Sequence, residues 1–145
     1  IPAAGLFDVL EHVDDRPALL AELHRIVEPG GMVVLTVPAY RWLWSDADVV
    51  AGHTTRYTRA RLLDELTAAG FRPQKVGYRF ASLVAPIAVL RALPHRLGRR
   101  PDLARTGREV SRTAGPLGDA ATWAERRVGR HLGFGTSVFG VFRRP

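Results

Sequence analysis

Residues 20–38 read LAELHRIVEPGGMVVLTVP, and this stretch decides the fold class. Its first part spaces apolar residues at helical intervals, so that Leu20 and Leu23 lie on one face. The Pro-Gly-Gly triplet at 29–31 ends this helix, and residues 32–37 then form a nearly continuous β-branched run. Such a run is typical of a strand that is covered on both faces, as in parallel sheets.

A second apolar run lies upstream, at residues 6–10 (LFDVL), and indicates a buried strand. Asp14 and Asp15 are signals for a helix start, and Pro17 suits a first helical turn because no hydrogen bond is lost there. Residues 6–37 therefore predict a strand–helix–strand unit with parallel strands and a right-handed crossover.

The pattern of short apolar segments separated by turn residues continues downstream. The sequence predicts an aromatic-rich loop at 39–57, a helix that Thr58 caps and Gly70 ends, a strand at 71–80, a helix at 80–97 that Pro86 kinks or starts, a flexible linker near 98–118, a helix at 120–132 and a last strand at 134–142.

The composition is that of a globular protein, with 46% hydrophobic and 24% charged residues among 145. The absence of cysteine excludes a disulfide framework, a zinc-thiolate site and a thiol nucleophile. No apolar run is long enough to predict a membrane-spanning helix, and no cleavable signal opens the chain.

The net charge of +7 is unevenly distributed along the chain. Residues 1–70 carry 6 Arg against 10 Asp and Glu, whereas residues 71–145 carry 15 Lys and Arg against 4 Asp and Glu. The apolar run from Phe80 leads into several of these arginines, a pattern typical of a helix on an anionic membrane surface. It is also typical of a helix packed on the sheet with a solvated arginine tail, which is the interpretation that we favour. Nothing in the charge pattern predicts a nucleic-acid partner.

Four segments resemble the second half of class I S-adenosylmethionine-dependent methyltransferases of the type 11/12 group. They are FDVLEHVDD (7–15), residues 20–38, GHTTRYTRARLLDELTAAGF (52–71) and FGTSVFGVFRR (134–144). The resemblance implies an α/β, Rossmann-like sheet with helices on both faces, of which this chain holds the later half, strands four to seven.

The resemblance also implies a division of the chain. Residues 1–80 would be the C-terminal half of the catalytic core, residues 81–133 a helical, Arg-rich insertion, and residues 134–145 the closing strand of the core. The family's Gly-rich cofactor loop and its ribose-binding acid have no counterpart, so we expect the other half to lie upstream of Ile1 and this chain to be inactive alone.

The acidic segment after the first strand is the expected reaction centre. The resemblance places Asp8, Leu10, Glu11 and His12 beside the methionine end of S-adenosylmethionine. There His12, together with Glu11, would act in catalysis by taking a proton from the acceptor. The structural alternative is that His12 caps the following turn and Glu11 binds backbone groups.

Our main expectation is a site without a metal ion, but a metal-dependent site is an alternative. Asp8, Glu11 and His12, with the distant His53, are similar to the E-x-x-E-H motif of ubiquinone-pathway O-methyltransferases and of small-RNA 2′-O-methyltransferases. Carboxylates and imidazole suit Mg²⁺ or a softer divalent ion. The first acid is aspartate, one methylene shorter than the motif requires.

The aromatic-rich loop is the expected acceptor site. Tyr40, Trp42 and Trp44 alternate, so in an extended loop they would share one side and form a lid over the acceptor, or else plug the core beneath the loop. The loop also carries three candidates for binding an anionic acceptor group, of which the arginine has the alternative of pairing with Asp46 or Asp48. They are His53, Arg56 and Tyr57.

These observations predict a cytoplasmic methyltransferase that uses S-adenosylmethionine and acts on a small-molecule or lipid-linked acceptor. The alternative is a non-catalytic basic module that binds anionic membranes through residues 80–100. In either case the expected membrane contact is peripheral, at the inner face.

Overall fold

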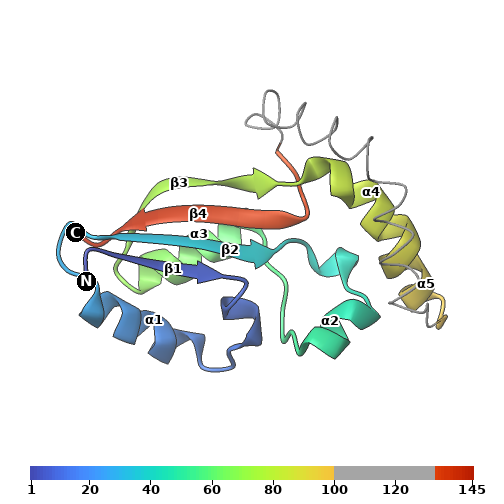
Figure 1. Ribbon diagram of the computed structural model, residues 1–145, viewed down its shortest axis with the longest axis horizontal. Helices are drawn as coiled ribbons and strands as arrows, with labels where there is room; N and C mark the ends of the chain where they lie inside the picture. Colours follow the sequence, from blue (N-terminus) through green and yellow to red (C-terminus); the bar gives the residue numbers. More distant parts are fainter. Residues whose placement is uncertain (100–132) are drawn as a thin grey trace.

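The computed structural model describes residues 1–99 and 133–145, which form one four-stranded sheet with helices (Figure 1). The strand order is β1-β2-β4-β3, where β1 is parallel to β2 and β4 is antiparallel to both of its neighbours. Strands β1, β2 and β3 therefore run in the same direction, and their carboxyl ends share one edge of the sheet, here called the carboxyl edge. The strands are β1 (Ala3–Phe7), β2 (Met32–Pro38), β3 (Arg72–Arg79) and β4 (Ser137–Arg143).

The strand–helix–strand unit is present as the sequence predicts, but its first strand lies three residues earlier than expected. β1 ends at Phe7, because Asp8 turns the backbone into the left-handed region at φ 52° and the 3₁₀ turn η1 (Leu10–His12) follows. Helix α1 (Arg16–Ile26) begins at its expected cap, where the Asp15 carboxylate accepts a hydrogen bond from the Ala18 amide at 3.0 Å.

The Pro-Gly-Gly turn between α1 and β2 is required by geometry. Gly30 has a φ of +85°, which favours glycine. A Cβ on Gly31 would lie 2.9 Å from the carbonyl oxygen of Pro2, so any side chain there would push β1 away from the turn.

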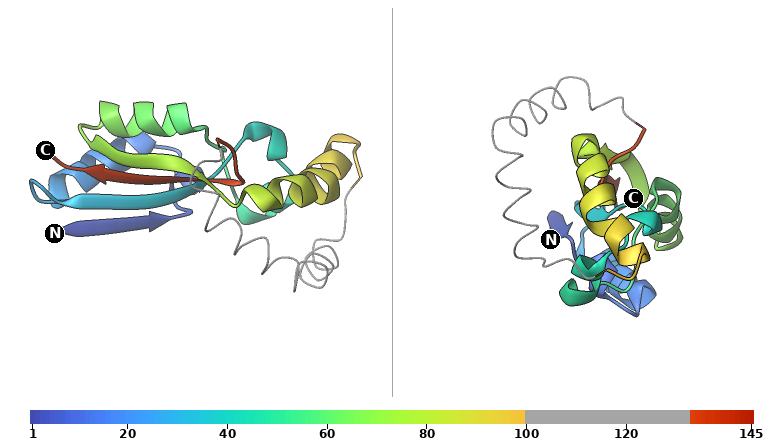
Figure 2. Two further views of the ribbon diagram at one scale, coloured as in Figure 1. Left: turned by 90° about the horizontal axis from the view of Figure 1, so that it is seen from above. Right: turned by 90° about the vertical axis from the view of Figure 1, so that its right-hand side faces the viewer.

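The long helices cover one face of the sheet. Helix α3 (Arg59–Ala68) is capped by Thr58, as expected, and lies beside α1 on the same face (Figure 2). Its Leu62 and Leu66 are fully buried in the same core cluster as the alternate residues Val33, Leu35 and Val37 of β2. These contacts form the hydrophobic core.

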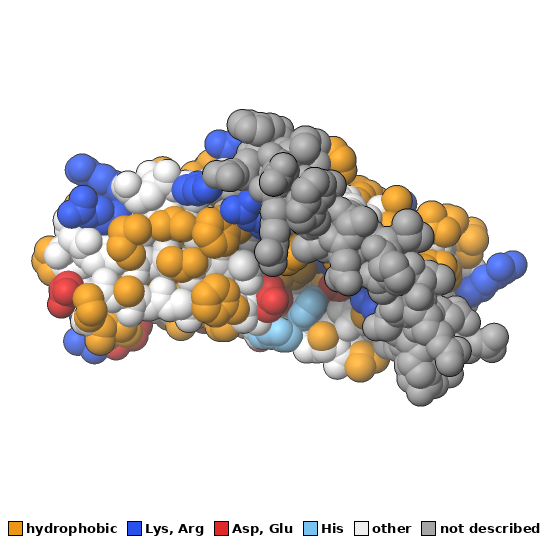
Figure 3. Space-filling view, turned by 45° about the horizontal axis from the view of Figure 1, so that its top comes forward, with side chains coloured by type: hydrophobic (Ala, Val, Ile, Leu, Met, Phe, Trp, Pro, Cys, Tyr) orange, Lys and Arg blue, Asp and Glu red, His pale blue; other side chains and the backbone are white. Residues whose placement is uncertain are grey.

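The opposite face of the sheet carries no helix among the residues that the structure describes. In β2 the residues facing α1 and α3 are fully buried, whereas Val34 and Thr36 on the other side remain partly exposed. Phe7, on the same open face, is 63% exposed, and hydrophobic side chains gather over this surface (Figure 3). The α/β fold class is confirmed, but the described residues contribute only one of its two helical layers.

A continuous helical segment leaves the sheet at the carboxyl edge (Figure 1). Pro86 lies in its first turns, where a missing amide costs little, and Pro94, which lacks a donor, follows a π-helical turn. None of the helices described is long and apolar enough to cross a membrane. The segment consists of η3 (Ala81–Leu83), α4 (Val84–Ile87), the π turn η4 (Ala88–Ala92) and α5 (Leu93–Arg96).

The sequence-based expectations for the Arg-rich region lie mostly outside the described residues. These are the linker near 98–118, the helix at 120–132 and most of the insertion at 81–133. The chain returns as β4, which begins at Ser137 rather than at the expected residue 134 and inserts between β2 and β3.

Candidate functional site

Backbone strain gathers at the carboxyl edge. Asp8, Tyr40 and Phe80 follow β1, β2 and β3, and all three have positive φ, at 52°, 57° and 59°. A non-glycine residue in this region costs about 1–3 kcal/mol and persists only where surrounding contacts enforce it. These are the only non-glycine residues with positive φ in the described part of the chain, so the strain marks this edge as a candidate functional site.

The loop after β2 is folded rather than extended. It contains the 3₁₀ turn η2 (Arg41–Leu43) and helix α2 (Asp46–Ala51), which the sequence analysis did not predict. The backbone amide and hydroxyl of Ser45 donate to Asp48 at 2.9 and 3.2 Å. A serine followed three residues later by an acid is a known start signal, so this helix was detectable from the sequence.

Asp48 is the centre of a buried ion network. Arg56 donates from Nε and Nη2 to its two carboxylate oxygens at 2.7 and 3.0 Å, which settles the expected choice between Asp46 and Asp48. His53 Nδ1 lies 2.8 Å from Oδ1 of the same carboxylate. Burial alone would raise the pKa of Asp48, but the hydrogen bonds from Arg56 and His53 outweigh it and hold that pKa below its ordinary value.

Glu11 and His12 lie in the 3₁₀ turn η1, and the loop after α2 holds them in place. Thr54 donates from its amide and its hydroxyl to the Glu11 carbonyl at 2.7 and 2.9 Å. His12 Nδ1 lies 3.3 Å from the Gly52 carbonyl oxygen, so its Nδ1–H donates there. The imidazole rings of His12 and His53 meet edge to face, with centroids 4.8 Å apart.

The Glu11 carboxylate has an unusual environment. Its side chain is fully buried, and neither oxygen has a hydrogen-bond partner among the residues that the structure describes. Desolvation raises its pKa above the ordinary value, because burial penalises the charged form. A buried carboxylate without a donor is costly, so this group is suited to a cationic or proton-donating partner.

The other residues predicted beside the cofactor lie apart from this pair. Asp8 is exposed, and its carboxylate accepts a hydrogen bond from the Thr36 hydroxyl at 3.3 Å. The Leu10 side chain is fully buried in the hydrophobic core, which leaves only its backbone for a ligand contact.

One grouping of metal-ligating atoms is present in the described residues. Atoms of Glu11, His12 and His53 lie within 4.8 Å of one another, whereas Asp8 does not belong to the group. Both imidazoles are oriented through Nδ1, one by a carbonyl and one by a carboxylate, as is common for histidines whose other nitrogen binds a ligand.

The aromatic residues of the loop separate into two environments. Tyr40 stacks between Trp42 and Tyr78, with centroid distances of 5.8 and 5.0 Å, and packs against the core, while Trp42 is 44% exposed. Because η2 turns the chain, the three aromatic side chains do not form one row, and Trp44 lines a separate hollow.

Tyr57, a predicted acceptor-binding residue, lies in the core. Its side chain is fully buried, and its hydroxyl donates to Glu65 at 3.0 Å. Desolvation raises the pKa of this hydroxyl. Tyr57 therefore supports the loop from beneath, since its backbone pairs with Pro38 and Tyr40, and it does not face the solvent side.

A hollow of about 350 Å³ lies beside the Glu11–His12 turn, and we call it the basic pocket. Two of its residues come from α5, about forty positions away from the loop, and sequence reasoning did not assign them to the site. His95 Nδ1 lies 3.0 Å from Asp46, and Arg96 donates to the Trp42 carbonyl at 2.9 Å. The lining residues are Arg41, Trp44, Thr54, Thr55, Arg56, His95 and Arg96.

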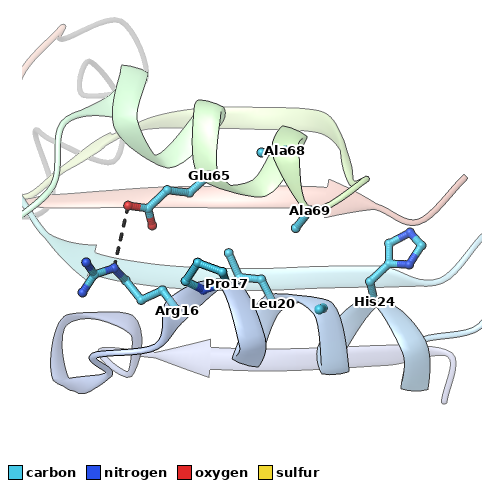
Figure 4. A pocket seen from close by; sticks show the side chains of 8 residues that line it. Arg16, Pro17, Leu20, His24, Glu65, Ala68 and Ala69 are labelled. Atoms are coloured by element: carbon cyan, nitrogen blue, oxygen red, sulfur yellow. Dashed lines mark ion pairs between the residues drawn. The ribbon is translucent and has the colours of Figure 1, made fainter.

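A larger hollow of about 520 Å³ runs between α1 and α3 on the helix-covered face (Figure 4). Most of its lining is apolar, from Pro17, Leu20 and the alanines of both helices. Its charged end is bridged by Arg16 and Glu65, which approach to 3.8 Å. Its two charged side chains therefore lie close to each other, and the other lining residue with a polar side chain is His24, whose ring contacts Phe71.

Comparison with known proteins identifies the family. Residues 3–76, about half of the chain, match a family described as a methyltransferase domain. The chain belongs to this methyltransferase domain family. No curated protein matches the chain.

Solved structures share the fold of this methyltransferase domain. The [4+2]-cyclase SpnF is 19% identical with a TM-score of 0.54, and phosphoethanolamine N-methyltransferase 2 from Haemonchus contortus is 16% identical with a TM-score of 0.52. Geranyl diphosphate C-methyltransferase from Streptomyces coelicolor A3(2) is 14% identical with a TM-score of 0.52. Each match covers 100% of this chain but only 50%, 33% and 48% of the other chain, so this chain spans half their length or less.

We predict that Asp48→Asn destabilises the full-length protein by about 3 kcal/mol, because it leaves the Arg56 charge buried without its partner. Urea denaturation measures the change. Adding Arg56→Met to this variant should recover part of the loss, because no unpaired charge then remains.

The matched control for this prediction is Glu22→Gln, which breaks an exposed ion pair with Arg25. Its denaturation midpoint should stay at the native value. Equal midpoints for Asp48→Asn and Glu22→Gln would contradict the assigned role of the network.

Proposed function

We propose that the full-length protein transfers a methyl group from S-adenosylmethionine to a small-molecule or lipid-linked acceptor at the carboxyl edge. The observation that carries this proposal is that His12 lies beside the buried Glu11, whose carboxylate oxygens have no partner in the described part of the chain, in the turn η1 that follows β1. Membership of the methyltransferase domain family supports it. One of the similar structures is a cyclase, so the fold alone does not decide the reaction.

The residues at this edge fit the proposed cofactor. The unpartnered Glu11 oxygens suit a cationic group, and Asp8 places a second carboxylate after the same strand. When bound, S-adenosylmethionine supplies a methyl group activated by a sulfonium. In such a displacement the protein acts mainly by holding the acceptor in line and excluding water.

His12 is the proposed base. Because its Nδ1–H donates to Gly52, its Nε2 is free to accept the proton that the acceptor loses as the new bond to carbon forms. The Glu11 carboxylate would then stabilise the resulting imidazolium. His53 stands beside it, held by Asp48, and limits the positions that the His12 ring can adopt.

The nature of the acceptor is suggested by the loop and by the similar proteins. Tyr40, Trp42 and Tyr78 form a stacked aromatic shelf near the edge, which suits a planar or apolar group. By their titles, two of the similar structures are methyltransferases of phosphoethanolamine and of geranyl diphosphate. Both are small molecules, and the second carries a lipid-like chain.

We predict that S-adenosylhomocysteine raises the melting temperature of the full-length protein, because a ligand that binds only the folded state stabilises it. Differential scanning fluorimetry over a concentration series measures the shift. A melting temperature that stays constant up to millimolar ligand would contradict the proposed cofactor.

For the base, we predict that His12→Gln lowers kcat by about 10²–10⁴-fold while S-adenosylhomocysteine still stabilises the protein. The assay follows S-adenosylhomocysteine formation with the acceptor that gives turnover in a panel of alcohols, phenols and amines. His24→Gln on α1, which contacts Phe71, is the matched control and should keep native kcat. A kcat within twofold of native for His12→Gln would rule out the proposed base.

A second role for the same cluster is to hold a divalent cation. The mutual approach of Glu11, His12 and His53, with both imidazoles oriented through Nδ1, supports it. Two imidazoles and one carboxylate favour a transition ion such as Mn²⁺ or Zn²⁺ over Mg²⁺. Such an ion would supply a Lewis acid for an acceptor oxygen.

If the cluster binds a cation, isothermal titration of the full-length protein with Mn²⁺ or Zn²⁺ should show one site. We predict that His53→Gln weakens this site at least tenfold, because one of three ligands is lost, and that His24→Gln does not. Absence of a saturable site, or equal loss in both variants, would leave the metal-free reaction as the function of the cluster.

Family membership favours an enzyme over a non-catalytic module, so membrane binding is proposed here only as an additional property of the enzyme. Val89, Leu93 and Leu97 recur every four residues along the helical segment and are 60%, 50% and 63% exposed. The neighbouring Arg96 and Arg99 are also exposed. We propose that the protein is cytoplasmic and that the apolar row of Val89, Leu93 and Leu97 binds an anionic lipid surface at the inner face of the membrane.

We predict that replacing Val89, Leu93 and Leu97 by serine reduces co-sedimentation of the full-length protein with vesicles of phosphatidylcholine and phosphatidylglycerol, because the apolar contact is lost. Raising the salt should also reduce native binding. Ile26→Ser, which removes an exposed apolar side chain from the far end of α1, is the control. Binding that ignores both lipid charge and salt would refute membrane contact.

A further inference from the structure

The basic pocket is built from two regions that are distant in the sequence. Arg41 and Arg56 come from the loop after β2, and Arg96 comes from α5, which the His95–Asp46 pair fastens to α2. Three arginines thus line one hollow, and neither aspartate nor glutamate is among the residues that line it.

The three arginines differ in what already holds them. Arg56 is committed to Asp48 and to the Ala39 carbonyl, so it contributes positive charge but few free donors. Arg96 uses Nη2 for the Trp42 carbonyl, which fixes its direction while leaving other donors. Neither Arg96 nor Arg41 pairs with a carboxylate within residues 1–99 and 133–145.

The other lining residues of the basic pocket suit a ligand in which a polar group is attached to an organic group. His95 is held through Nδ1 and leaves Nε2 for a ligand, while Thr54 and Thr55 add hydroxyl groups and Trp44 adds an apolar ring. The volume of about 350 Å³ is at the lower end of ligand pockets and exceeds what a single phosphate group needs.

The pocket adjoins the proposed reaction centre. Thr54, which lines it, donates two hydrogen bonds to the Glu11 carbonyl, and Arg56 shares Asp48 with His53. A ligand anchored by the arginines therefore extends naturally toward His12, one residue beyond Glu11.

We propose that the basic pocket binds the phosphate or diphosphate group of the methyl acceptor. Planar guanidinium forks match phosphate oxygens in pairs, and arginine, unlike lysine, makes these bonds with fixed geometry. This inference rests on the proposed methyl transfer and narrows its acceptor to phosphorylated molecules. The same phosphate chemistry is offered by a soluble phosphate ester and by a lipid headgroup.

The test uses inorganic pyrophosphate as the probe, titrated calorimetrically into the full-length protein. Native protein should bind it at one site. The double variant Arg41→Gln and Arg96→Gln should bind it at least tenfold more weakly, while Arg96→Lys, which keeps the charge but loses the fork, should fall between the two.

The matched control is the double variant Arg72→Gln and Lys75→Gln. It removes the same charge from exposed positions on β3, of which Arg72 lies at the opposite edge of the sheet from the pocket. It should bind pyrophosphate within twofold of native protein. No binding by native protein, or equal loss in the two double variants, would overturn the proposal, the second result because it reveals only general charge attraction.

Two further measurements are needed. The first distinguishes a lipid acceptor from a soluble one, and the second distinguishes failure of the basic pocket from failure of the proposed methyl transfer. Vesicles that contain phosphatidic acid should compete with pyrophosphate if the acceptor is a lipid, whereas phosphatidylcholine vesicles should not. A soluble acceptor predicts no competition by either. S-adenosylhomocysteine should stabilise the native protein and the double variant Arg41→Gln and Arg96→Gln equally. If it stabilises neither protein, that result counts against methyl transfer and not against the basic pocket.

Discussion

The buried Asp48 carboxylate is the interaction on which the carboxyl edge depends. Through Arg56 it reaches the Ala39 carbonyl at the end of β2, and through His53 it reaches the ring of His12. A buried ion pair of this kind contributes little net stability by itself, but losing one partner is costly, because the other charge stays out of water. The network therefore acts chiefly to specify one arrangement of the loop, and with it the positions of both imidazoles.

The direction of the strands explains why the site lies where it does. Because β1, β2 and β3 run the same way, the residues that follow them meet at one edge, and three of those residues are held at positive φ. Helices on one face supply the hydrophobic core that fixes these strands, while the polar groups collect beyond their ends. The hydrophobic core and the candidate site therefore lie in different parts of the sheet, as is usual in open α/β folds.

Part of the positive charge of the chain is concentrated at the basic pocket. The first 70 residues are acidic overall, yet two of their arginines, Arg41 and Arg56, face Arg96 from the basic half across one hollow. Asp48 and the Ala39 carbonyl hold Arg56 in this position, and the Trp42 carbonyl holds Arg96. That convergence, rather than the total of +7, is what suggests an anionic ligand.

Periodicity and turn residues were sufficient to predict α1, β2, α3 and β3 close to their observed limits, since these signals are local in the chain. They placed β1 three residues too late, because Leu10 is buried like a strand residue although it lies in a 3₁₀ turn. Helix α2 was missed despite its capping residues, because the aromatic residues around it favoured an extended lid.

The sequence by itself determined the parallel strand–helix–strand unit, because spacing and residue type carry that information. The candidates Glu11, His12 and His53 came from its resemblance to known methyltransferases. Only the tertiary structure decided that Tyr57 is buried, that Asp48 joins Arg56 to His53, and that α5 completes the basic pocket. Burial depends on how the elements pack, and so does the choice of Asp48 rather than Asp46 as the partner of Arg56. The α5 contacts join residues 49 and 54 positions apart, which no local pattern in the chain records.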